Sequence, residues 1–342
     1  MPIFMIGTQR SGSNLLRLML NQLPEVAAPH PPHILQRLMP LVPQYGDLRN
    51  DAALALLADD VCRLVELNPV AWEGASLKTE DLIRRARARS LTALFGAAYD
   101  CLAEAWGKST WCCKSLANIH YLNDIEACFG AEARYIYLYR DGRDVALSFR
   151  KAIVGEKHPY HIGREWAATQ EVALAARERI GPSRFISVRY EDLVARPEAT
   201  IRALCQFLGY PFHVSMLDFH ATDEARKAAE SSALWGNVVN PVMAGNTRKY
   251  LKEMPTEDIH VFERVAGDVL TALGYERSAS PTGTDNAFTA EEIRQFDADN
   301  ARFKKEMLDR TDPEDIKRRD RQAGYIQEIK QRQSGGGAWI NL

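Results

Sequence analysis

The chain has 342 residues, of which 46% are apolar and 26% charged, and its formal net charge at pH 7 is −2. These values are typical of a globular protein with one large core, and the near-neutral charge argues against a dedicated nucleic-acid binder. No apolar run approaches the roughly 18–20 residues that a membrane span requires. Any anion site must therefore come from a local cluster of basic residues.

The N-terminus and the cysteines both favour a cytoplasmic protein. A strand is expected to begin at Ile3, which leaves no room for a signal peptide. The six cysteines show no Cys-x-x-Cys spacing and lie mainly in apolar surroundings. Buried free thiols in a reducing compartment are therefore expected, and a disulfide among the six is the less favoured alternative.

The first twenty residues show the pattern of a phosphate-binding loop. Residues 3–6 are typical of a buried strand, residues 7–12 of a loop, and residues 15–20 of an apolar helix. In this layout backbone N–H groups and a helix N-terminus face an anion. The glycine spacing matches the start of a Walker A motif, but Ser13-Asn14 stands where that motif has Lys-Ser/Thr. The loop therefore indicates a phosphate-like anion held by Arg10 without magnesium.

The rest of the chain alternates strands and helices. Apolar patterns typical of strands cover residues 111–113, 133–139 and 184–188. Patterns typical of helices cover residues 51–67, 79–106, 145–151, 164–180 and a stretch that ends near residue 208. Four prolines hold the segment 23–33 extended where a second strand would begin. The alternation predicts an α/β fold of three layers, P-loop-like, with a central parallel sheet flanked by helices.

The character of the chain changes near residue 275. We expect an α/β domain over residues 1–275, a linker over 276–289 and a charge-dense extension over 290–342. The composition of the extension leaves three arrangements open: a solvated helix, a helical arm on the core or on a partner, and a partly disordered tail. A homo-oligomer formed through the extension is one form of the second arrangement. The Ser-Gly-Gly-Gly run at 334–337 predicts a flexible segment.

A second candidate phosphate site follows the strand 133–139. Arg140 ends this strand, and Ser148 follows eight residues later across a strand-to-helix turn. If the helix begins near Gly142, Ser148 lies roughly 9 Å along its axis. An arginine at the strand end and a hydroxyl on the helix can then hold one phosphate between them.

These two segments resemble the phosphate motifs of sulfotransferases that use 3′-phosphoadenosine 5′-phosphosulfate (PAPS). Arg-Ser-Gly-Ser-Asn-Leu-Leu at 10–16 resembles the 5′-phosphosulfate loop. Tyr-Leu-Tyr-Arg-Asp-Gly-Arg-Asp-Val-Ala-Leu-Ser at 137–148 resembles the 3′-phosphate motif, with the same spacing from arginine to serine. The motifs stand in the family's order. The resemblance covers about residues 3–275 and points to a bacterial-type or tyrosylprotein-sulfotransferase-like branch.

The resemblance implies which residues bind PAPS. Lys114 matches the family's lysine at a strand end, which contacts the bridging oxygen and the sulfuryl group. Tyr190, within Arg-Tyr-Glu-Asp-Leu at 189–193, matches a tyrosine beside the nucleotide. In the loop 245–250, Lys249 is favoured over Arg248 as the basic residue on the phosphates. The implied nucleotide-binding set is Arg10, Ser11, Gly12, Ser13, Asn14, Arg140, Ser148, Tyr190 and Lys249.

The resemblance also implies sulfuryl transfer to a hydroxyl-bearing acceptor. Family members use a histidine or a glutamate near the end of the second strand as general base. Register favours His30 in this role, with His33 as the alternative, and Glu25 is less favoured because it precedes the strand. A histidine near its reference pKa of about 6.5 can accept a proton at neutral pH. Arg10 and Lys114 are suited to stabilise charge on the leaving 5′-phosphate, and no metal is required.

Some features depart from the family pattern, and two other functions stay open. The GDKTP-like wording is missing, the spacing from Trp106 to Lys114 is stretched, and Asn14 replaces a frequent threonine. A P-loop kinase-like phosphotransferase would need a Walker lysine and a magnesium ligand, which the loop lacks. A non-catalytic nucleotide-binding protein would be expected to lose Lys114 or the base. The acceptor, whether sugar, lipid, phenol or peptide tyrosine, is not specified by the sequence.

Overall fold

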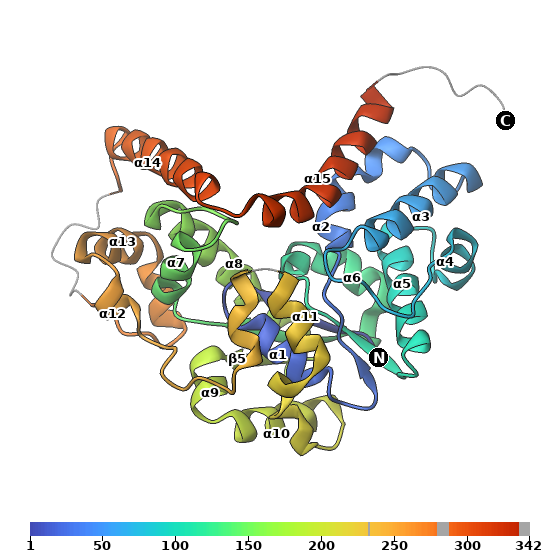
Figure 1. Ribbon diagram of the computed structural model, residues 1–342, viewed down its shortest axis with the longest axis horizontal. Helices are drawn as coiled ribbons and strands as arrows, with labels where there is room; N and C mark the ends of the chain where they lie inside the picture. The colour runs from blue at the N-terminus through green and yellow to red at the C-terminus, as the bar shows by residue number, and fades with distance from the viewer. Residues whose placement is uncertain (232, 279–286, 335–342) are drawn as a thin grey trace.

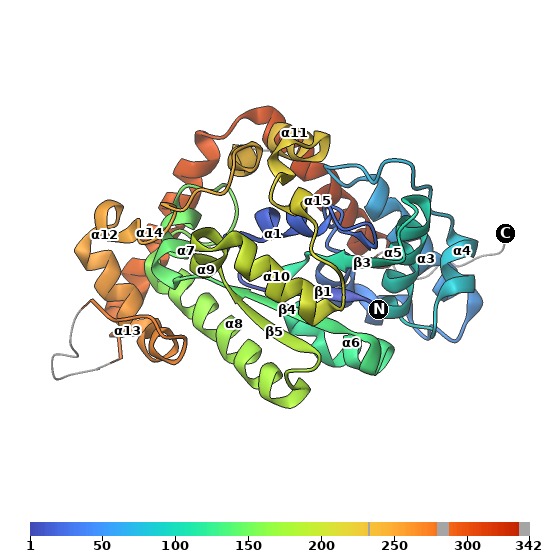
Figure 2. The same cartoon turned by 90° about the horizontal axis from the view of Figure 1, so that it is seen from below.

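Five parallel strands form the centre of the fold within the part of the chain that is described. The computed structural model describes residues 1–231, 233–278 and 287–334. The strands lie in the order β2-β3-β1-β4-β5, and each neighbouring pair is parallel. Figure 2 labels β3, β1, β4 and β5 in this order. Their bounds are β1 Ile3–Gly7, β2 Val26–Ala27, β3 Thr110–Cys113, β4 Arg134–Tyr139 and β5 Phe185–Arg189.

The sheet separates two hydrophobic cores. Phe4 and Ile6 of β1 belong to one core, and Ile3 and Met5 belong to the other. This division follows because successive side chains of a strand point to opposite faces. Helices cover both faces, so the molecule has three layers (Figure 2). The predicted α/β fold with a central parallel sheet is therefore confirmed.

Helices of different parts of the chain cover the two faces. The first core lies under α2 to α6, and the second lies under α1, α10 and α11. A third, smaller core joins α7, α8 and α13. The helix bounds are α1 Ser13–Leu20, α2 Ile34–Leu38, α3 Asp51–Glu66, α4 Thr79–Arg85, α5 Leu91–Ala105, α6 Leu122–Phe129, α7 Gly142–Arg150, α8 Pro159–Ile180, α9 Tyr190–Ala195, α10 Pro197–Leu208, α11 Asp223–Ser231, α12 Tyr250–Glu253, α13 Thr256–Ala272, α14 Ala290–Asp309 and α15 Pro313–Ser334.

Most predicted elements agree with the structure, but the single helix over 79–106 is wrong. The chain leaves the helix after Arg85 and starts α5 at Leu91. Ser90 caps the new helix by accepting a hydrogen bond from the Ala93 N–H at 3.2 Å. Between the helices, Arg89 donates to the Leu48 carbonyl at 2.7 Å. The break therefore arises from a side-chain cap and tertiary contacts that apolar spacing does not reveal. The six cysteines are free thiols, as expected.

Gly7 ends β1 where the backbone of β4 lies very close. It pairs with Leu138 and has a φ of 135°. A Cβ atom at this position would lie 2.3 Å from the Leu138 carbonyl oxygen, so only glycine fits. The loop after β1 therefore begins directly beside the end of β4.

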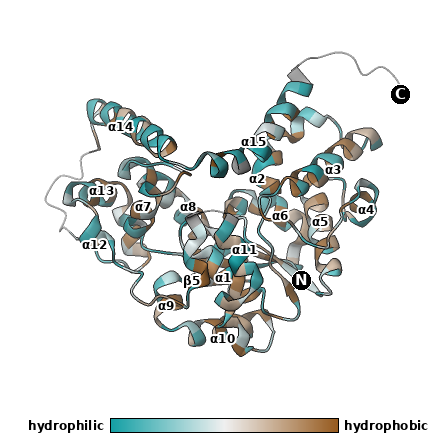
Figure 3. Cartoon of the chain, viewed as in Figure 1, coloured by the Kyte–Doolittle hydropathy of each residue, from teal (hydrophilic) through white to brown (hydrophobic). Residues whose placement is uncertain are grey.

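The C-terminal helices α14 and α15 pack on the α/β core. They are largely hydrophilic, in contrast to the more hydrophobic α5 (Figure 3), yet Ile329 of α15 is fully buried in the first core. Figure 1 shows α14 beside α7 and α8, and α15 beside α2 and α3. Most of the predicted linker 276–289, and the predicted flexible run after Ser334, lie outside the described residues.

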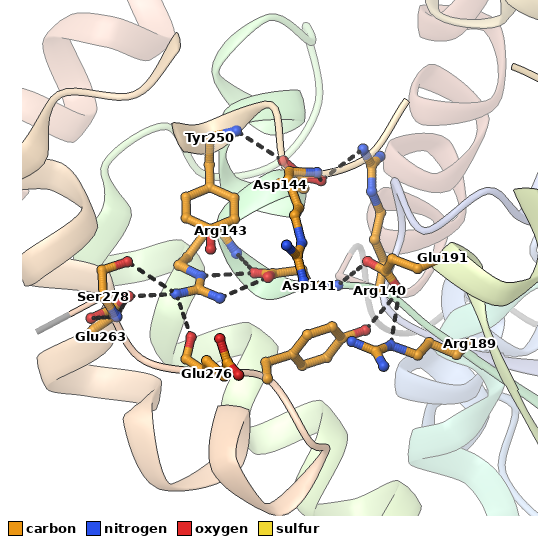
Figure 4. Close-up of polar contacts among 12 residues, drawn as sticks. Arg140, Asp141, Arg143, Asp144, Arg189, Glu191, Tyr250, Glu263, Glu276 and Ser278 are labelled. Carbon is orange, nitrogen blue, oxygen red and sulfur yellow. Dashed lines mark hydrogen bonds and ion pairs between the residues drawn. The ribbon is translucent and has the colours of Figure 1, made fainter. Parts of the chain in front are cut away.

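A buried ion-pair network holds the turn after β4. Arg143 donates to both carboxylate oxygens of Asp141, at 3.0 and 2.8 Å, and forms an ion pair with Glu263 of α13 (Figure 4). Arg143 and Asp141 are at most 4% exposed, and Glu263 is 3% exposed. On the other side of the turn, Asp144 accepts from the N–H groups of Arg248 at 2.8 Å and Tyr250 at 3.0 Å. The network therefore fixes the turn that carries Arg140.

Replacing Arg143 with alanine should lower the free energy of unfolding by about 3–5 kcal/mol, because two carboxylates would stay buried without their cation. Urea denaturation of the two proteins measures this difference. The control is Arg202→Ala, which breaks an exposed pair with Glu198 and should cost less than about 1 kcal/mol. Equal losses in the two variants would contradict the assigned role of Arg143.

Candidate active site

A cavity of about 1010 Å³ opens at the carboxyl ends of the strands. Residues that follow each of the five strands contribute to its lining, namely Thr8, His30, Lys114, Arg140 and Tyr190. In parallel α/β sheets this edge is where ligands bind, because all the strand-to-helix loops converge there. The structure thus brings segments from Gly7 to Lys249, which lie 242 positions apart, into one site.

The loop between β1 and α1 forms one wall of the cavity. Arg10 and Gly12 both have left-handed backbone conformations, with φ of 68° and 88°. A Cβ atom on Gly12 would lie 2.4 Å from the ring of Tyr190, so this glycine lets the tyrosine pack against the loop. The loop residues in the lining are Thr8, Gln9, Arg10, Gly12, Ser13 and Asn14.

Ser11 lies behind this wall and outside the cavity lining. It is fully buried, and its hydroxyl has no hydrogen-bond partner among the described residues. The role of Ser11 in binding the phosphosulfate stays a prediction. Burying a hydroxyl without a hydrogen-bond partner costs folding free energy. The Ser11 hydroxyl is therefore a candidate to form a hydrogen bond with a ligand or water held by the loop.

Arg10, Arg140 and Ser148 meet at one end of the cavity. The Nε of Arg10 donates to the Ser148 hydroxyl at 3.0 Å, and Arg140 donates to the Arg10 carbonyl at 3.2 Å. The guanidinium of Arg140 also lies 4.5 Å from the centre of the Tyr190 ring. Its Nε is buried without a partner among the described residues. The two predicted phosphate motifs therefore form one cationic cluster.

Asn246 completes this cluster and was not singled out from the sequence. Its carbonyl accepts from Arg140 at 3.0 Å, and its side-chain amide donates to the Tyr190 hydroxyl at 2.7 Å. Lys249, three residues later, lines the cavity. Arg248 is exposed, has a φ of 55° and lies outside the lining. The position of Lys249 in the cavity lining is therefore consistent with the preference for Lys249 over Arg248. In the sequence, only the family resemblance of the loop 245–250 had indicated these residues.

Lys114 lies deeper in the cavity and is 7% exposed. Its Nζ donates to the Asn14 side-chain carbonyl at 2.7 Å and lies 5.7 Å from the centre of the Trp235 ring. Burial, and then the nearby charges of Arg17 and Arg10, lower the pKa of Lys114 well below its usual value. A bound anion would counter both effects. Trp235, from the segment η6 Ala233–Val239, is a site residue whose position only the fold reveals.

His30 faces the same space as Lys114. Its ring lies 4.5 Å from the ring of Trp235, and its backbone carbonyl accepts from Asn68 and Trp72, each at 2.9 Å. Neither ring nitrogen has a hydrogen-bond partner among the described residues. Burial first, and then the charge of Lys114, lower the pKa of His30 well below 6.5. The imidazole is therefore neutral at pH 7 and can accept a proton.

His33 is oriented differently from His30. It precedes α2 with a φ of 59°, and its Nδ1 lies 2.9 Å from the Ser115 hydroxyl. Burial and the charges of Lys114 and Arg37 lower the pKa of His33 to about 3. In the protein without ligand, the pKa of each histidine is therefore lower than the reference value of about 6.5, because both lie beside cations and away from solvent.

The cavity is electropositive although the chain is nearly neutral. The basic residues in its lining are Arg10, Arg37, Lys114, Arg140, Lys151 and Lys249, and the acidic ones are Asp144 and Glu165. Both oxygens of Asp144 already accept backbone N–H groups. The net result is a polar, cationic site suited to a ligand with several negative charges.

Comparison with known proteins identifies the family. Residues 2–214 match the model of a sulfotransferase family. The chain belongs to this family. It is 25% identical to protein-tyrosine sulfotransferase A of Caenorhabditis elegans over 287 residues, which cover 82% of this chain and 68% of the relative. It is also 25% identical to protein-tyrosine sulfotransferase 2 of Gallus gallus over 289 residues, covering 82% and 70%.

Solved structures agree on the fold of this sulfotransferase. The sulfotransferase domain from the curacin biosynthetic pathway superposes with a TM-score of 0.54 at 22% identity, over 80% of this chain and 97% of the domain. The sulfotransferase domain from the Synechococcus PCC 7002 olefin synthase gives 0.52 at 19% identity, over 77% and 94%. In the described part of this sulfotransferase, no helix combines the length and apolarity of a membrane span.

The low pKa of His33 predicts how stability depends on pH. The unfolded chain binds a proton at His33 below about pH 6.5, whereas the folded chain does not until about pH 3. Stability is therefore complete above pH 6.5 and falls as the pH is lowered toward 3. Between pH 7.5 and 5.5, His33→Asn should remove about 1.4 kcal/mol of the wild-type decrease in unfolding free energy. Asparagine is chosen because it tolerates the left-handed backbone of this position.

Urea denaturation at the two pH values measures this effect. The control is His260→Asn, an exposed position on α13, which should keep the wild-type difference. An unchanged difference in His33→Asn would show that His33 is not held neutral by burial.

Proposed function

We propose that this sulfotransferase moves the sulfuryl group of PAPS to a hydroxyl acceptor by in-line displacement, with His30 as general base. One observation carries the proposal. A cationic cluster at Arg140, a glycine loop, a buried lysine and a neutral histidine without ring partners share one cavity. Burying the arginines, the lysine or the unpaired histidine without a partner costs free energy. A ligand with several negative charges, together with an acceptor hydroxyl, would supply partners for all of them.

The residues present fit the donor PAPS. Arg140, Ser148 and Lys249 would hold its 3′-phosphate, and Arg10 with the loop 12–14 would hold its 5′-phosphosulfate. The orphaned Nε of Arg140 and the buried Ser11 hydroxyl are the polar atoms that such a ligand could satisfy, directly or through water. Tyr190 packs against both the loop and Arg140, which places an aromatic face beside the nucleotide. When bound, PAPS supplies an activated sulfuryl group.

The protein's own residues then handle one proton and one developing charge. A ring nitrogen of His30 takes the proton of the acceptor hydroxyl as the oxygen attacks sulfur. The Lys114 ammonium and Arg10 stabilise the negative charge that develops on the oxygen between sulfur and the leaving phosphate. The negative charge of the donor raises the pKa of both Lys114 and His30 from their values in the free protein, because it opposes the neighbouring cations. Trp235 lies against both residues and excludes water from them.

The names of the relatives indicate which acceptor class to test first. Two of them are named protein-tyrosine sulfotransferases, so a tyrosine in a peptide is the first acceptor to test. Transfer of ³⁵S-labelled sulfate from PAPS to tyrosine peptides, simple phenols, sugars and lipid alcohols tests the function. Thermal stabilisation by 3′,5′-bisphosphoadenosine (PAP), but not by Mg-ATP, is expected. Stabilisation by Mg-ATP alone would overturn the proposal. The cytoplasmic location expected from the sequence stays a prediction.

The Arg140 side chain should account for much of the nucleotide affinity. Arg140→Ala should weaken PAP binding by about 2–5 kcal/mol, roughly 30-fold to several thousand-fold, because a buried phosphate would lose its charged partner. Arg140→Lys should fall between the two, since it keeps the charge without the planar fork. Isothermal titration calorimetry measures both, with Arg202→Ala as the control that retains wild-type affinity. Wild-type binding by Arg140→Ala would refute the assignment.

His30 should affect turnover and leave donor binding unchanged. His30→Ala should reduce kcat by roughly 10²–10⁴-fold, the usual contribution of a general base. PAP affinity should stay within about twofold of wild type, because the ring would contact the acceptor. His33→Ala is the paired variant and should be milder. The opposite ranking would exchange the two roles, and full activity of both variants would exclude a histidine base.

A further inference from the structure

The C-terminal arm, defined here as α14 and α15 (residues 290–334), contacts both walls of one half of the cavity. We call this half the acceptor side, because one of its walls, α2, directly follows His33, one of the two candidate bases. One wall is the loop 151–158 with the start of α8, which contributes Lys151, Val154, Gly155 and Glu165 to the lining. The other wall is α2, which contributes Gln36 and Arg37 after His33. The walls are far apart in sequence and join different cores.

Asn300 of α14 binds the end of the loop 151–158. Its side-chain oxygen accepts from the N–H groups of Lys157 at 2.8 Å and His158 at 3.0 Å. Its amide donates to Glu156, which also accepts from Lys304 of the arm at 2.7 Å. Asn300 is only 8% exposed. One arm residue therefore holds three successive residues of the loop just before α8 begins.

This contact extends to the residues that line the cavity. The buried Lys157 folds its side chain back, and its Nζ donates to the carbonyls of Val154 and Gly155, each at 2.7 Å. Both of those residues belong to the lining. On the outer side, Phe296 of the arm stacks on His158 with a ring separation of 4.5 Å. The position of the loop wall thus depends on α14 through a short chain of direct contacts.

The second helix of the arm holds the other wall through α3 and the turn after α2. The Asp60 carboxylate of α3 is 1% exposed and accepts from Tyr325 and Arg332 of α15. It also accepts from Tyr45, the last residue of the turn η1 Met39–Tyr45 that directly follows α2. Ile329 packs in the same core as Leu35 and Leu38 of α2. Gln322 adds a hydrogen bond to the Leu64 carbonyl at 2.9 Å.

We propose that the C-terminal arm sets the separation of the two acceptor-side walls, with Asn300 as a positioning residue for acceptor binding. Three residues, 310–312, join α14 to α15, so the two anchored surfaces cannot move independently. Figure 1 shows the arm extending from the α7 and α8 side of the molecule to the α2 and α3 side. The arm therefore controls which acceptors fit, while the sheet-edge loops hold the donor. This inference rests on the proposed function, because it assumes that the hydroxyl acceptor binds on the acceptor side.

The test uses the full-length protein with Asn300→Ala, and Arg294→Ala as the matched control. Arg294 is exposed on the same helix and pairs with Glu291 of that helix. In hydrogen exchange, Asn300→Ala should exchange at residues 154–158 at least about tenfold faster than wild type, because the loop loses its external partner. The Arg294→Ala protein should match wild type. Unchanged exchange at 154–158 in Asn300→Ala overturns the inference.

Kinetics separate a positioning role from a general loss of structure. With a tyrosine peptide or 4-nitrophenol as acceptor, Asn300→Ala should raise the acceptor KM about 5–10-fold, with kcat and the PAP Kd within about twofold. Equal changes in acceptor KM and PAP Kd would show a global effect and overturn the proposal.

A second variant addresses the separation itself. Two glycines inserted between Thr311 and Asp312 leave the contacts of Asn300, Tyr325 and Arg332 possible but relax the distance between the anchors. This protein should keep slow exchange at 154–158 and show the same rise in acceptor KM. If the insertion variant has the acceptor KM of the wild type, the proposal that the arm sets the separation of the two walls is overturned. If the wild type transfers sulfate to none of the four acceptor classes, namely tyrosine peptides, simple phenols, sugars and lipid alcohols, the proposed function fails. The exchange measurement still decides whether the arm holds the loop.

Discussion

The parallel pairing of β1 with β4 is the constraint on which the site depends. It places the loop after β1 and the turn after β4 at the same edge of the sheet, so that Arg10, Arg140 and Ser148 come within hydrogen-bonding distance. Gly7 makes the pairing possible to the last residue, because any side chain there would collide with the Leu138 carbonyl. The ion pairs of Arg143 and the hydrogen bonds of Asp144 to backbone N–H groups then hold the turn after β4 in place. The geometry of the cationic cluster is thus set by backbone pairing before any ligand binds.

The chemistry of the site follows from burying charge without its counter-ion. Lys114 and the two histidines lie near other cations in the cavity, and the pKa of each is lowered. The unfavourable free energy of placing these groups together is offset when an oppositely charged ligand binds. A strongly anionic ligand would have this effect here. The same field keeps His30 neutral, which is the protonation state that a general base requires. Under the proposed function, donor binding and the action of His30 as base are two consequences of one electrostatic arrangement.

The two sides of the cavity, as the proposed function assigns them, are formed by different kinds of structural element. The donor half consists of loops at strand ends, whose positions are set by the sheet. The acceptor side consists of α2, the loop 151–158 and the start of α8. The C-terminal arm contacts both of its walls. Such a division lets acceptor choice change through the arm and its contacts while the sulfuryl-transfer machinery stays the same.

The sequence by itself determined the strands, most of the helices and the two phosphate motifs, because apolar periodicity and short glycine loops are local properties of the chain. The resemblance to sulfotransferases also pointed to Lys114, Tyr190 and the histidines. The sequence did not reveal the break after Arg85, the place of Ser11 behind the loop, or the contribution of Asn246 and Trp235. Nor did it show that α14 and α15 support the acceptor side. These features depend mainly on contacts between residues far apart in sequence, from 41 positions for Arg89 and Leu48 to 272 positions for Arg332 and Asp60. Only the packed tertiary structure decides which distant side chains meet and how far each is removed from water.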